Sequence, residues 1–323
     1  MWKKIGLGLS VAGVAFVLLF ALALWWPAPR TDGEFTITYN PSQWPEIEPE
    51  SEYQTRNGDS LPLRVYRAEE SDTVLILLHG ISLYGYYFDE MATYLAKGSV
   101  ATVYAPDLRG HGYGMSPRGH LDYEDQLVDD IADLVAHVRQ EMPEARIVVG
   151  GHSAGGGLVV RLAGSDQAEG VDGYLLIAPA LGIEAPSTNE DFGGLIKVRL
   201  PRLIGLSLLN GIGLGAMDGL DVLYLTYPDE VQRERQVLTY SWRYTKALTP
   251  SDYQRDLESI EAPLLLVAGD EDEIFNAEYY PSIIENHAPH GQVVIKAGFN
   301  HFEDIFTNRK TLEVYASWLK GLK

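Results

Sequence analysis

Short apolar runs recur along this 323-residue chain and alternate with longer polar or amphipathic stretches. Their continuous apolar character is typical of strands that are buried on both faces of a sheet. The stretches between several of them have the length and apolar spacing of helices. The strands are predicted at residues 73–80, 99–107, 146–152, 173–179, 263–269 and 292–298. Such alternation predicts an α/β fold with a mostly parallel sheet flanked by helices.

The alternation is interrupted between residues 182 and 250. This segment has no clear strand pattern, but contains a stretch rich in Leu, Ile and Gly and then an aromatic one. Since the alternation resumes beyond residue 260, we expect an insertion at one edge of the sheet. The core of the fold is therefore predicted in two parts, residues 51–181 and residues 251–323. An Asn-Gly turn near the start of the first part predicts a hairpin.

The first thirty residues have the pattern of a membrane anchor. No charged residue occurs from Ile5 to Trp26, and as a helix this stretch would span roughly 33 Å, enough to cross the apolar core of a bilayer. Trp25 and Trp26 at its end belong to a residue type favoured at membrane interfaces. The pattern predicts a single N-terminal transmembrane helix with its flanks over residues 1–30, followed by a linker over residues 31–50.

The orientation of this anchor follows from its flanking charges. Lys3 and Lys4 favour a cytoplasmic N-terminus, which would place the rest of the chain on the non-cytoplasmic side of the membrane. A cleaved signal peptide stays open as the alternative, because Ala21-Leu22-Ala23 fits the small-x-small pattern of a cleavage site. In that case the protein would be secreted.

The composition excludes several classes of protein. The chain contains no cysteine, which rules out a thiol nucleophile, disulfides and cysteine-ligated zinc. Its net charge of −20 argues against a nucleic-acid partner, since such partners require a basic surface. No metal-ligand cluster and no nucleotide-binding glycine pattern is visible, so neither a metal nor a cofactor is predicted.

Polar residues follow several of the predicted strands at their carboxyl ends. In open parallel sheets this is the edge at which ligands bind. The residues are His79, Asp107, Ser153, Asp270, Asp272, Asn300 and His301. A serine, an acid and a histidine are therefore expected to converge on one side of the sheet.

Ser153 lies in the pentapeptide Gly151-His152-Ser153-Ala154-Gly155, which fits the pattern Gly-x-Ser-x-Gly. A strand precedes this pentapeptide and a helix follows it, as in the sharp turn known as a nucleophile elbow. The serine of such a turn lies at a helix N-terminus, where backbone N–H groups stabilise developing negative charge. The context predicts that Ser153 is a nucleophile.

The order of residues along the chain selects the base. In this arrangement the serine comes first, then the acid, then the histidine. Of the three histidines after the candidate acids, His287, His290 and His301, only His301 lies beyond the carboxyl end of a strand. We therefore predict His301 as the general base. One acid of the run from Asp270 to Glu273 should orient it, and the residues leave the choice between them open.

Two backbone N–H groups are needed to bind the oxyanion that forms during acyl transfer. One is predicted from Ala154, the residue after the nucleophile. The other is predicted from Ile81, in the loop after the strand at residues 73–80.

These residues resemble the α/β-hydrolase superfamily, and more narrowly its monoacylglycerol lipase and lysophospholipase group. The resemblance covers roughly residues 50–320. It is carried by "LLHG" (77–80), "APDLRGHGYGMSPRGH" (105–120), "YEDQLVDDIADLV" (123–135), "GGHSAGGG" (150–157), "PLLLVAGDED" (263–272) and "GFNHFEDI" (298–305).

The resemblance implies an α/β-hydrolase fold with a helical lid over residues 182–250, inserted between the sixth and seventh strands. It also implies that Asp272 is the acid, because in this group the acid follows three residues after the Gly that closes its strand. The implied activity is that of a serine hydrolase cleaving lipid-type carboxylic esters, of monoacylglycerol or lysophospholipid type, through an acyl-enzyme. A short-chain esterase, or a peptidase or amidase on the same fold, stays open as the alternative.

Overall fold

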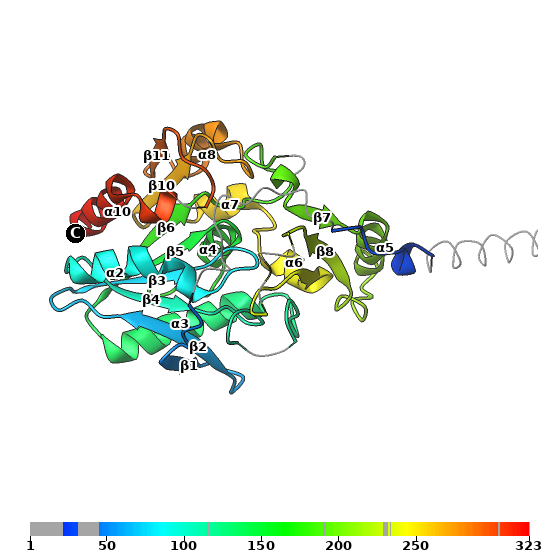
Figure 1. The fold of residues 1–323 in the computed structure, drawn as a ribbon, viewed down its shortest axis with the longest axis horizontal. Helices are drawn as coiled ribbons and strands as arrows, with labels where there is room; N and C mark the ends of the chain where they lie inside the picture. The colour runs from blue at the N-terminus through cyan, green and yellow to red at the C-terminus, as the bar shows by residue number, and fades with distance from the viewer. Residues whose placement is uncertain are drawn as a thin grey trace, which may run out of the picture.

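The computed structural model describes residues 22–31, 45–114, 117–189, 192–228, 232, 234–302 and 304–322. Within them an eight-stranded sheet forms the centre of the molecule (Figure 1). Its strands are β1 (Ser51–Gln54), β2 (Ser60–Tyr66), β3 (Thr73–Leu78), β4 (Thr102–Pro106), β5 (Arg146–His152), β6 (Gly173–Ile177), β10 (Leu264–Gly269) and β11 (Gln292–Lys296).

The sheet is mostly parallel, as predicted. Its strand order is β1-β2-β4-β3-β5-β6-β10-β11. Only β2 runs antiparallel to its neighbours, β1 and β4, and the β1–β2 pair is the predicted hairpin. All other neighbouring pairs are parallel. The carboxyl ends of β3, β5, β6, β10 and β11 therefore lie along the same edge of the sheet.

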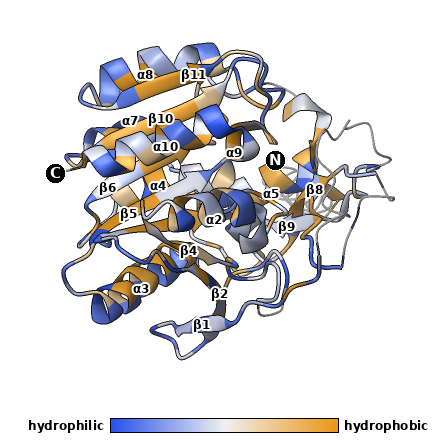
Figure 2. Ribbon diagram, turned by 60° about the vertical axis from the view of Figure 1, so that its left-hand side comes forward, coloured by the Kyte–Doolittle hydropathy of each residue, from blue (hydrophilic) through white to orange (hydrophobic). Residues whose placement is uncertain are grey.

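Helices cover both faces of this sheet. The helices α3 (Gln126–Glu141), α4 (Ala154–Ala163), α7 (Tyr253–Glu258) and α8 (Tyr280–His287) pack on one face, and α2 (Asp89–Lys97) and α10 (Arg309–Gly321) pack on the other. Strand β3 shows why. Val74, Ile76 and Leu78 join the first core while Leu75 and Leu77 join the second, because successive side chains of a strand point to opposite faces. Figure 2 shows the hydrophobic strands between helices whose outer faces are hydrophilic.

Residues 182–250, which we call the insertion, lie between β6 and β10, the sixth and seventh strands of the main sheet. The prediction of a helical segment without strands is wrong in part. The insertion contains α5 (Leu200–Asn210) and α6 (Trp242–Ala247), but also a small antiparallel sheet of β7 (Ile196–Val198), β8 (Asp221–Leu225) and β9 (Thr239–Ser241). These strands are too short for a clear alternation of apolar and polar residues, and they pair with segments distant in sequence.

The insertion is fastened to the core through the loop that follows β4. The Ser241 N–H donates to the Gly119 carbonyl at 3.0 Å, and the guanidinium of Arg243 donates to the Leu121 carbonyl at 2.8 Å. Gly119 has a φ of +65°, and a Cβ there would clash with the carbonyl of Thr239. The insertion is therefore in close contact with this loop.

The predicted membrane anchor is not supported. Among the described residues no helix is both long and apolar enough to cross a bilayer, and this finding corrects the prediction of a membrane-anchored protein. Residues 22–25 form a short helical stretch beside α5 (Figure 1). Leu24 is buried, and its carbonyl accepts a 2.7 Å hydrogen bond from Arg202 Nε. The length of an uncharged run could not show that its end packs against the insertion.

Several predictions for the N-terminal region lie outside the described residues. They concern residues 1–21, which include most of the predicted anchor and the first residue of the predicted cleavage site, and residues 32–44 of the predicted linker.

Candidate active site

Ser153 lies in the sharp turn between β5 and α4. Its backbone has φ 56° and ψ −121°, a conformation that a non-glycine residue seldom adopts. The neighbouring glycines make the turn possible. A Cβ at Gly151 would clash with the Gly155 carbonyl, and a Cβ at Gly155 would clash with the Leu78 carbonyl. The pentapeptide therefore has the local structure that the sequence predicts.

The backbone of Ser153 is fixed on both sides. Its N–H donates to the Ile177 carbonyl at 2.9 Å, at the end of the neighbouring strand β6. Its carbonyl accepts hydrogen bonds from the N–H groups of Gly157 and Ala180, at 3.0 and 2.9 Å. The first of these begins α4, so the serine side chain projects from the N-terminus of a ten-residue helix.

Asp272 and His301 form a buried pair beyond the ends of β10 and β11. Asp272 Oδ2 is 2.7 Å from His301 Nδ1, and the two side chains are almost fully excluded from solvent. The other carboxylate oxygen, Oδ1, accepts hydrogen bonds from the N–H groups of Ile274 and Phe275, at 2.9 and 2.8 Å. Because both oxygens have donors, the carboxylate is held in one orientation and can keep the proton of the imidazole on Nδ1.

His152 brings the loop of His301 close to the serine. Its Nε2 donates to the His301 carbonyl at 3.0 Å, and the two imidazole rings lie 4.5 Å apart between centroids. In the part of the chain that the structure describes, no hydrogen bond joins Ser153 Oγ to His301. Hydrogen bonds between a nucleophile and its base are often long before substrate binds.

The neighbouring acids have other partners. Asp270 Oδ1 accepts from the Gly298 N–H at 2.6 Å, and Glu273 Oε2 accepts from the His301 N–H at 2.9 Å. Asp272 is thus the acid that contacts the His301 ring, whereas Asp270 holds the loop that follows β11. The contact of Glu273 was missed by the sequence analysis, because a run of four acids does not show which of them faces inward.

Ile81 lies in the β3 loop, the name we use for residues 79–84. This loop passes over the serine, since a Cβ at Gly80 would lie 3.1 Å from Ser153 Cβ. Among the described residues, neither the N–H of Ile81 nor the N–H of Ala154 donates a hydrogen bond to another group. Ile81 directly follows Gly80 and Ala154 directly follows Ser153, so both stay candidates for the two donors that an oxyanion requires.

His79 fixes the start of the β3 loop. Its Nδ1 lies 2.9 Å from the Gly80 carbonyl, and its Nε2 lies 3.0 Å from the Leu108 N–H. The carbonyl can only accept and the amide can only donate, so Nδ1 bears the proton and Nε2 is bare. Burial lowers the pKa of His79 to about 4, which keeps the ring neutral.

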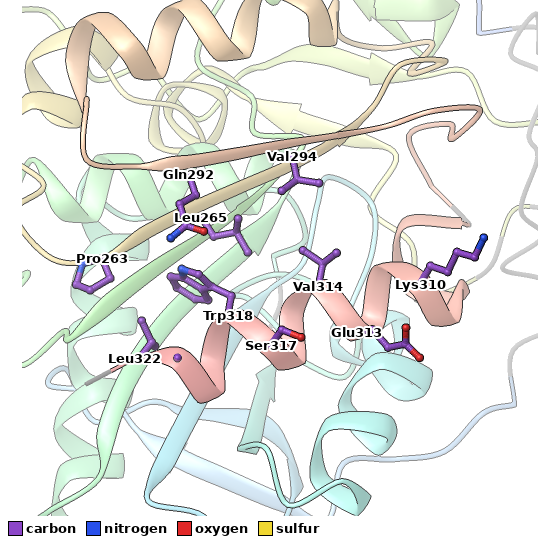
Figure 3. A pocket seen from close by; sticks show the side chains of 11 residues that line it. Pro263, Leu265, Gln292, Val294, Lys310, Glu313, Val314, Ser317, Trp318 and Leu322 are labelled. Carbon is purple, nitrogen blue, oxygen red and sulfur yellow. The ribbon is translucent and has the colours of Figure 1, made fainter.

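A cavity of about 830 Å³ lies elsewhere, between α10, the edge strand β11 and its neighbour β10 (Figure 3). Pro263 and Gln292, at the starts of these strands, line it together with Val294 and Trp318. The starts of parallel strands lie opposite their carboxyl ends. Pro263 and Gln292 thus lie at the opposite end of their strands from the predicted site, and none of the predicted site residues lines the cavity.

The fold is that of an α/β hydrolase. A family model described as "Serine aminopeptidase, S33" matches residues 69–302. The chain belongs to this family of α/β hydrolases.

Two curated relatives are lipases by name. The chain is 28% identical to the monoglyceride lipase of Rattus norvegicus over 163 residues, which are 50% of this chain and 51% of the rat protein. It is 26% identical to the monoacylglycerol lipase of Mycolicibacterium smegmatis over 208 residues, which are 62% of this chain and 70% of that protein. The chain thus spans about half the length of the rat relative.

Solved structures share the fold. The crystal structure of a soluble variant of monoglyceride lipase from Saccharomyces cerevisiae, in complex with a substrate analog, superposes with a TM-score of 0.65 and 16% identity. The match covers 90% of this chain and 98% of the yeast chain. At this identity the likeness confirms the α/β-hydrolase fold.

Proposed function

We propose that this protein is a serine hydrolase that cleaves carboxylic esters of lipid type through an acyl-enzyme. The observation that carries the proposal is the strained turn at Ser153, which lies beneath a loop with a free N–H donor and near a buried Asp272–His301 pair. Such strain is retained where a side chain must be presented for chemistry.

The proposed reaction assigns a role to every residue of the site. Ser153 Oγ attacks the ester carbonyl while His301 Nε2 takes the hydroxyl proton. Asp272 holds His301 in the tautomer that leaves Nε2 bare, and it stabilises the imidazolium. The N–H groups of Ile81 and Ala154 bind the oxyanion. His301 then returns the proton to the leaving alcohol, and water, activated by the same histidine, releases the acid from the serine.

The lipid character of the substrate is supported by the relatives and by the insertion. The two curated relatives described above are named as a monoglyceride lipase and a monoacylglycerol lipase. Helix α5 in the insertion exposes Leu200, Ile204 and Leu208, which are spaced by four residues and form its outer face. By contrast Leu206 is fully buried and belongs to the main hydrophobic core, so its role is in packing.

A series of p-nitrophenyl esters tests the proposal. With each added methylene contributing about 0.8 kcal/mol when buried, four more acyl carbons should raise kcat/KM by up to about a hundredfold. Ser153→Ala should abolish most of this turnover, whereas Ser259→Ala, at an exposed serine, should leave it unchanged. Turnover that survives in Ser153→Ala contradicts the assignment of the nucleophile.

The family name supports a second candidate, the hydrolysis of peptides or amides. An aminoacyl-anilide measured beside the esters separates the two. A maximum of kcat/KM at acetate or butyrate indicates a small-ester hydrolase, and a preference for the anilide indicates a peptidase.

A further inference from the structure

Tyr240, at the centre of β9, reaches from the insertion into the β3 loop. Its side chain is fully buried, and its hydroxyl oxygen accepts a 2.7 Å hydrogen bond from the N–H of Ser82. The same oxygen lies 2.8 Å from Nε2 of His111, which belongs to the loop after β4. Ser82 directly follows Ile81, whose N–H is the proposed oxyanion donor.

The hydrogen bonds continue beyond His111 to a second tyrosine of the insertion. Tyr244, in α6, has its hydroxyl oxygen 3.0 Å from His111 Nδ1 and 2.8 Å from the carbonyl of Arg109. His111 Nδ1 is itself 3.2 Å from that carbonyl. The side chains of Tyr240, His111 and Tyr244 are all buried.

The chemistry of these groups fixes the direction of every hydrogen bond. A carbonyl only accepts, so Tyr244 donates its single proton to Arg109 and accepts from His111 Nδ1–H. Burial lowers the pKa of His111 well below its ordinary value, so the ring is neutral and its Nε2 is bare. Tyr240 therefore donates to Nε2, and its oxygen is left to accept from Ser82. Burial raises the pKa of both tyrosines, which keeps their protons in place.

The β3 loop needs this support. Ser82 has a φ of 65°, which is unfavourable for a serine, and it is fully buried. The hydrogen bond within the turn, from the Leu83 N–H to the Gly80 carbonyl, is long at 3.3 Å. The contact from Tyr240 is much shorter and fixes the peptide plane between Ile81 and Ser82.

We propose that Tyr240 is a positioning residue for the oxyanion hole, which it completes from the insertion by holding the peptide that follows Ile81. The proposal rests on the proposed function. It implies that the Ile81 N–H is aimed at the reacting carbonyl only while β9 is in place on the core. The hydrogen bond from the Ser241 N–H, in β9, to the Gly119 carbonyl in the loop after β4 keeps it there.

The variant Tyr240→Phe tests this proposal, with Tyr315→Phe as the matched control. Tyr315 is also fully buried and donates to a backbone carbonyl, that of Ile305 in α9 (Asp304–Thr307), but it lies on α10. For each protein we would measure kcat and KM on a p-nitrophenyl ester, and the inhibition constant of an alkyl trifluoromethyl ketone. That inhibitor forms an oxyanion on the serine, so its affinity reports directly on the two N–H donors.

Tyr240→Phe should lower kcat by about ten- to a hundredfold, since complete loss of an oxyanion donor costs about a hundred- to a thousandfold. KM should change less than about twofold, and the inhibition constant should rise in parallel with the loss of kcat. Tyr315→Phe should leave kcat, KM and the inhibition constant unchanged. A folded Tyr240→Phe protein with wild-type kcat and inhibition constant overturns the proposal, and so does an equal loss in Tyr315→Phe.

Two further variants test the proposal if Tyr240→Phe does not fold, and separate it from the proposed function. If Tyr240→Phe does not fold, His111→Leu removes the acceptor that orients the Tyr240 hydroxyl, and it should lower kcat and inhibitor affinity together by a smaller factor. Unchanged values there overturn the proposal. Ser153→Ala separates this proposal from the proposed function: turnover independent of Ser153 contradicts the function, whereas Ser153-dependent turnover that tolerates the loss of the Tyr240 hydroxyl contradicts only the role of Tyr240.

Discussion

Three acidic residues of the run 270–273 each bind a different group. Asp272 binds the ring of His301, Glu273 binds its backbone N–H, and Asp270 binds the N–H of Gly298. Three neighbouring carboxylates thus hold one loop at three points, and only Asp272 touches the imidazole.

These contacts predict unequal effects of two isosteric substitutions. Asp272→Asn should lower kcat by about a thousand- to ten-thousandfold, because the amide favours the wrong tautomer of His301 and cannot stabilise its cation. Asp270→Asn keeps an oxygen that can accept from Gly298, so kcat should fall less than about tenfold. The measurement is kcat on a p-nitrophenyl ester at saturating concentration. A larger loss in Asp270→Asn would assign the acid to that residue instead.

The sequence predicts individual elements best where the rules are local. The run at residues 73–80 predicts β3 because every residue of that strand is buried. The elbow at Ser153 is predictable because its two glycines are required by backbone contacts within a few residues and with the adjacent strand. The His111–Tyr240 contact joins residues 129 positions apart, and no local pattern records it.

We expect substitutions on the buried and the exposed face of helix α5 to have different effects on stability. Leu206 is fully buried while Leu208 is 57% exposed. Leu206→Ala should lower the free energy of unfolding by about 2–4 kcal/mol, since it leaves a cavity in the core. Leu208→Ala should change it by less than about 0.5 kcal/mol. Urea unfolding of both variants checks this, and equal losses would mean that the outer face of α5 is also covered.

At the scale of the whole molecule, three buried neutral histidines should make the free energy of unfolding depend on pH. Burial lowers the pKa of His79 to about 4, and it lowers the pKa values of His111 and His152 well below their ordinary value. A histidine whose pKa is lower in the fold takes up a proton on unfolding. Its contribution to stability is therefore complete above about pH 6.5 and is lost as the pH falls toward the folded pKa.

The free energy of unfolding should accordingly fall between pH 7 and pH 5. His79 alone accounts for about 2 kcal/mol of this loss, from the difference between its folded pKa of about 4 and the ordinary value of 6.5. Urea unfolding at a series of pH values measures the slope. A free energy that stays constant over this range would show that these rings titrate in the folded protein with the same pKa as in the unfolded chain.

The contact between Tyr240 and Ser82 has a consequence for redesign of the enzyme. An insertion that contacts a loop of the proposed active site is a natural part to exchange when a different substrate range is wanted. In this protein the exchange would also remove the hydroxyl that holds the peptide after Ile81. A chimaera that carries a foreign insertion should therefore bind its new ester yet turn it over slowly, unless the graft retains a tyrosine at the position of β9. Exchange of this one segment should therefore change the substrate preference and the turnover rate at the same time.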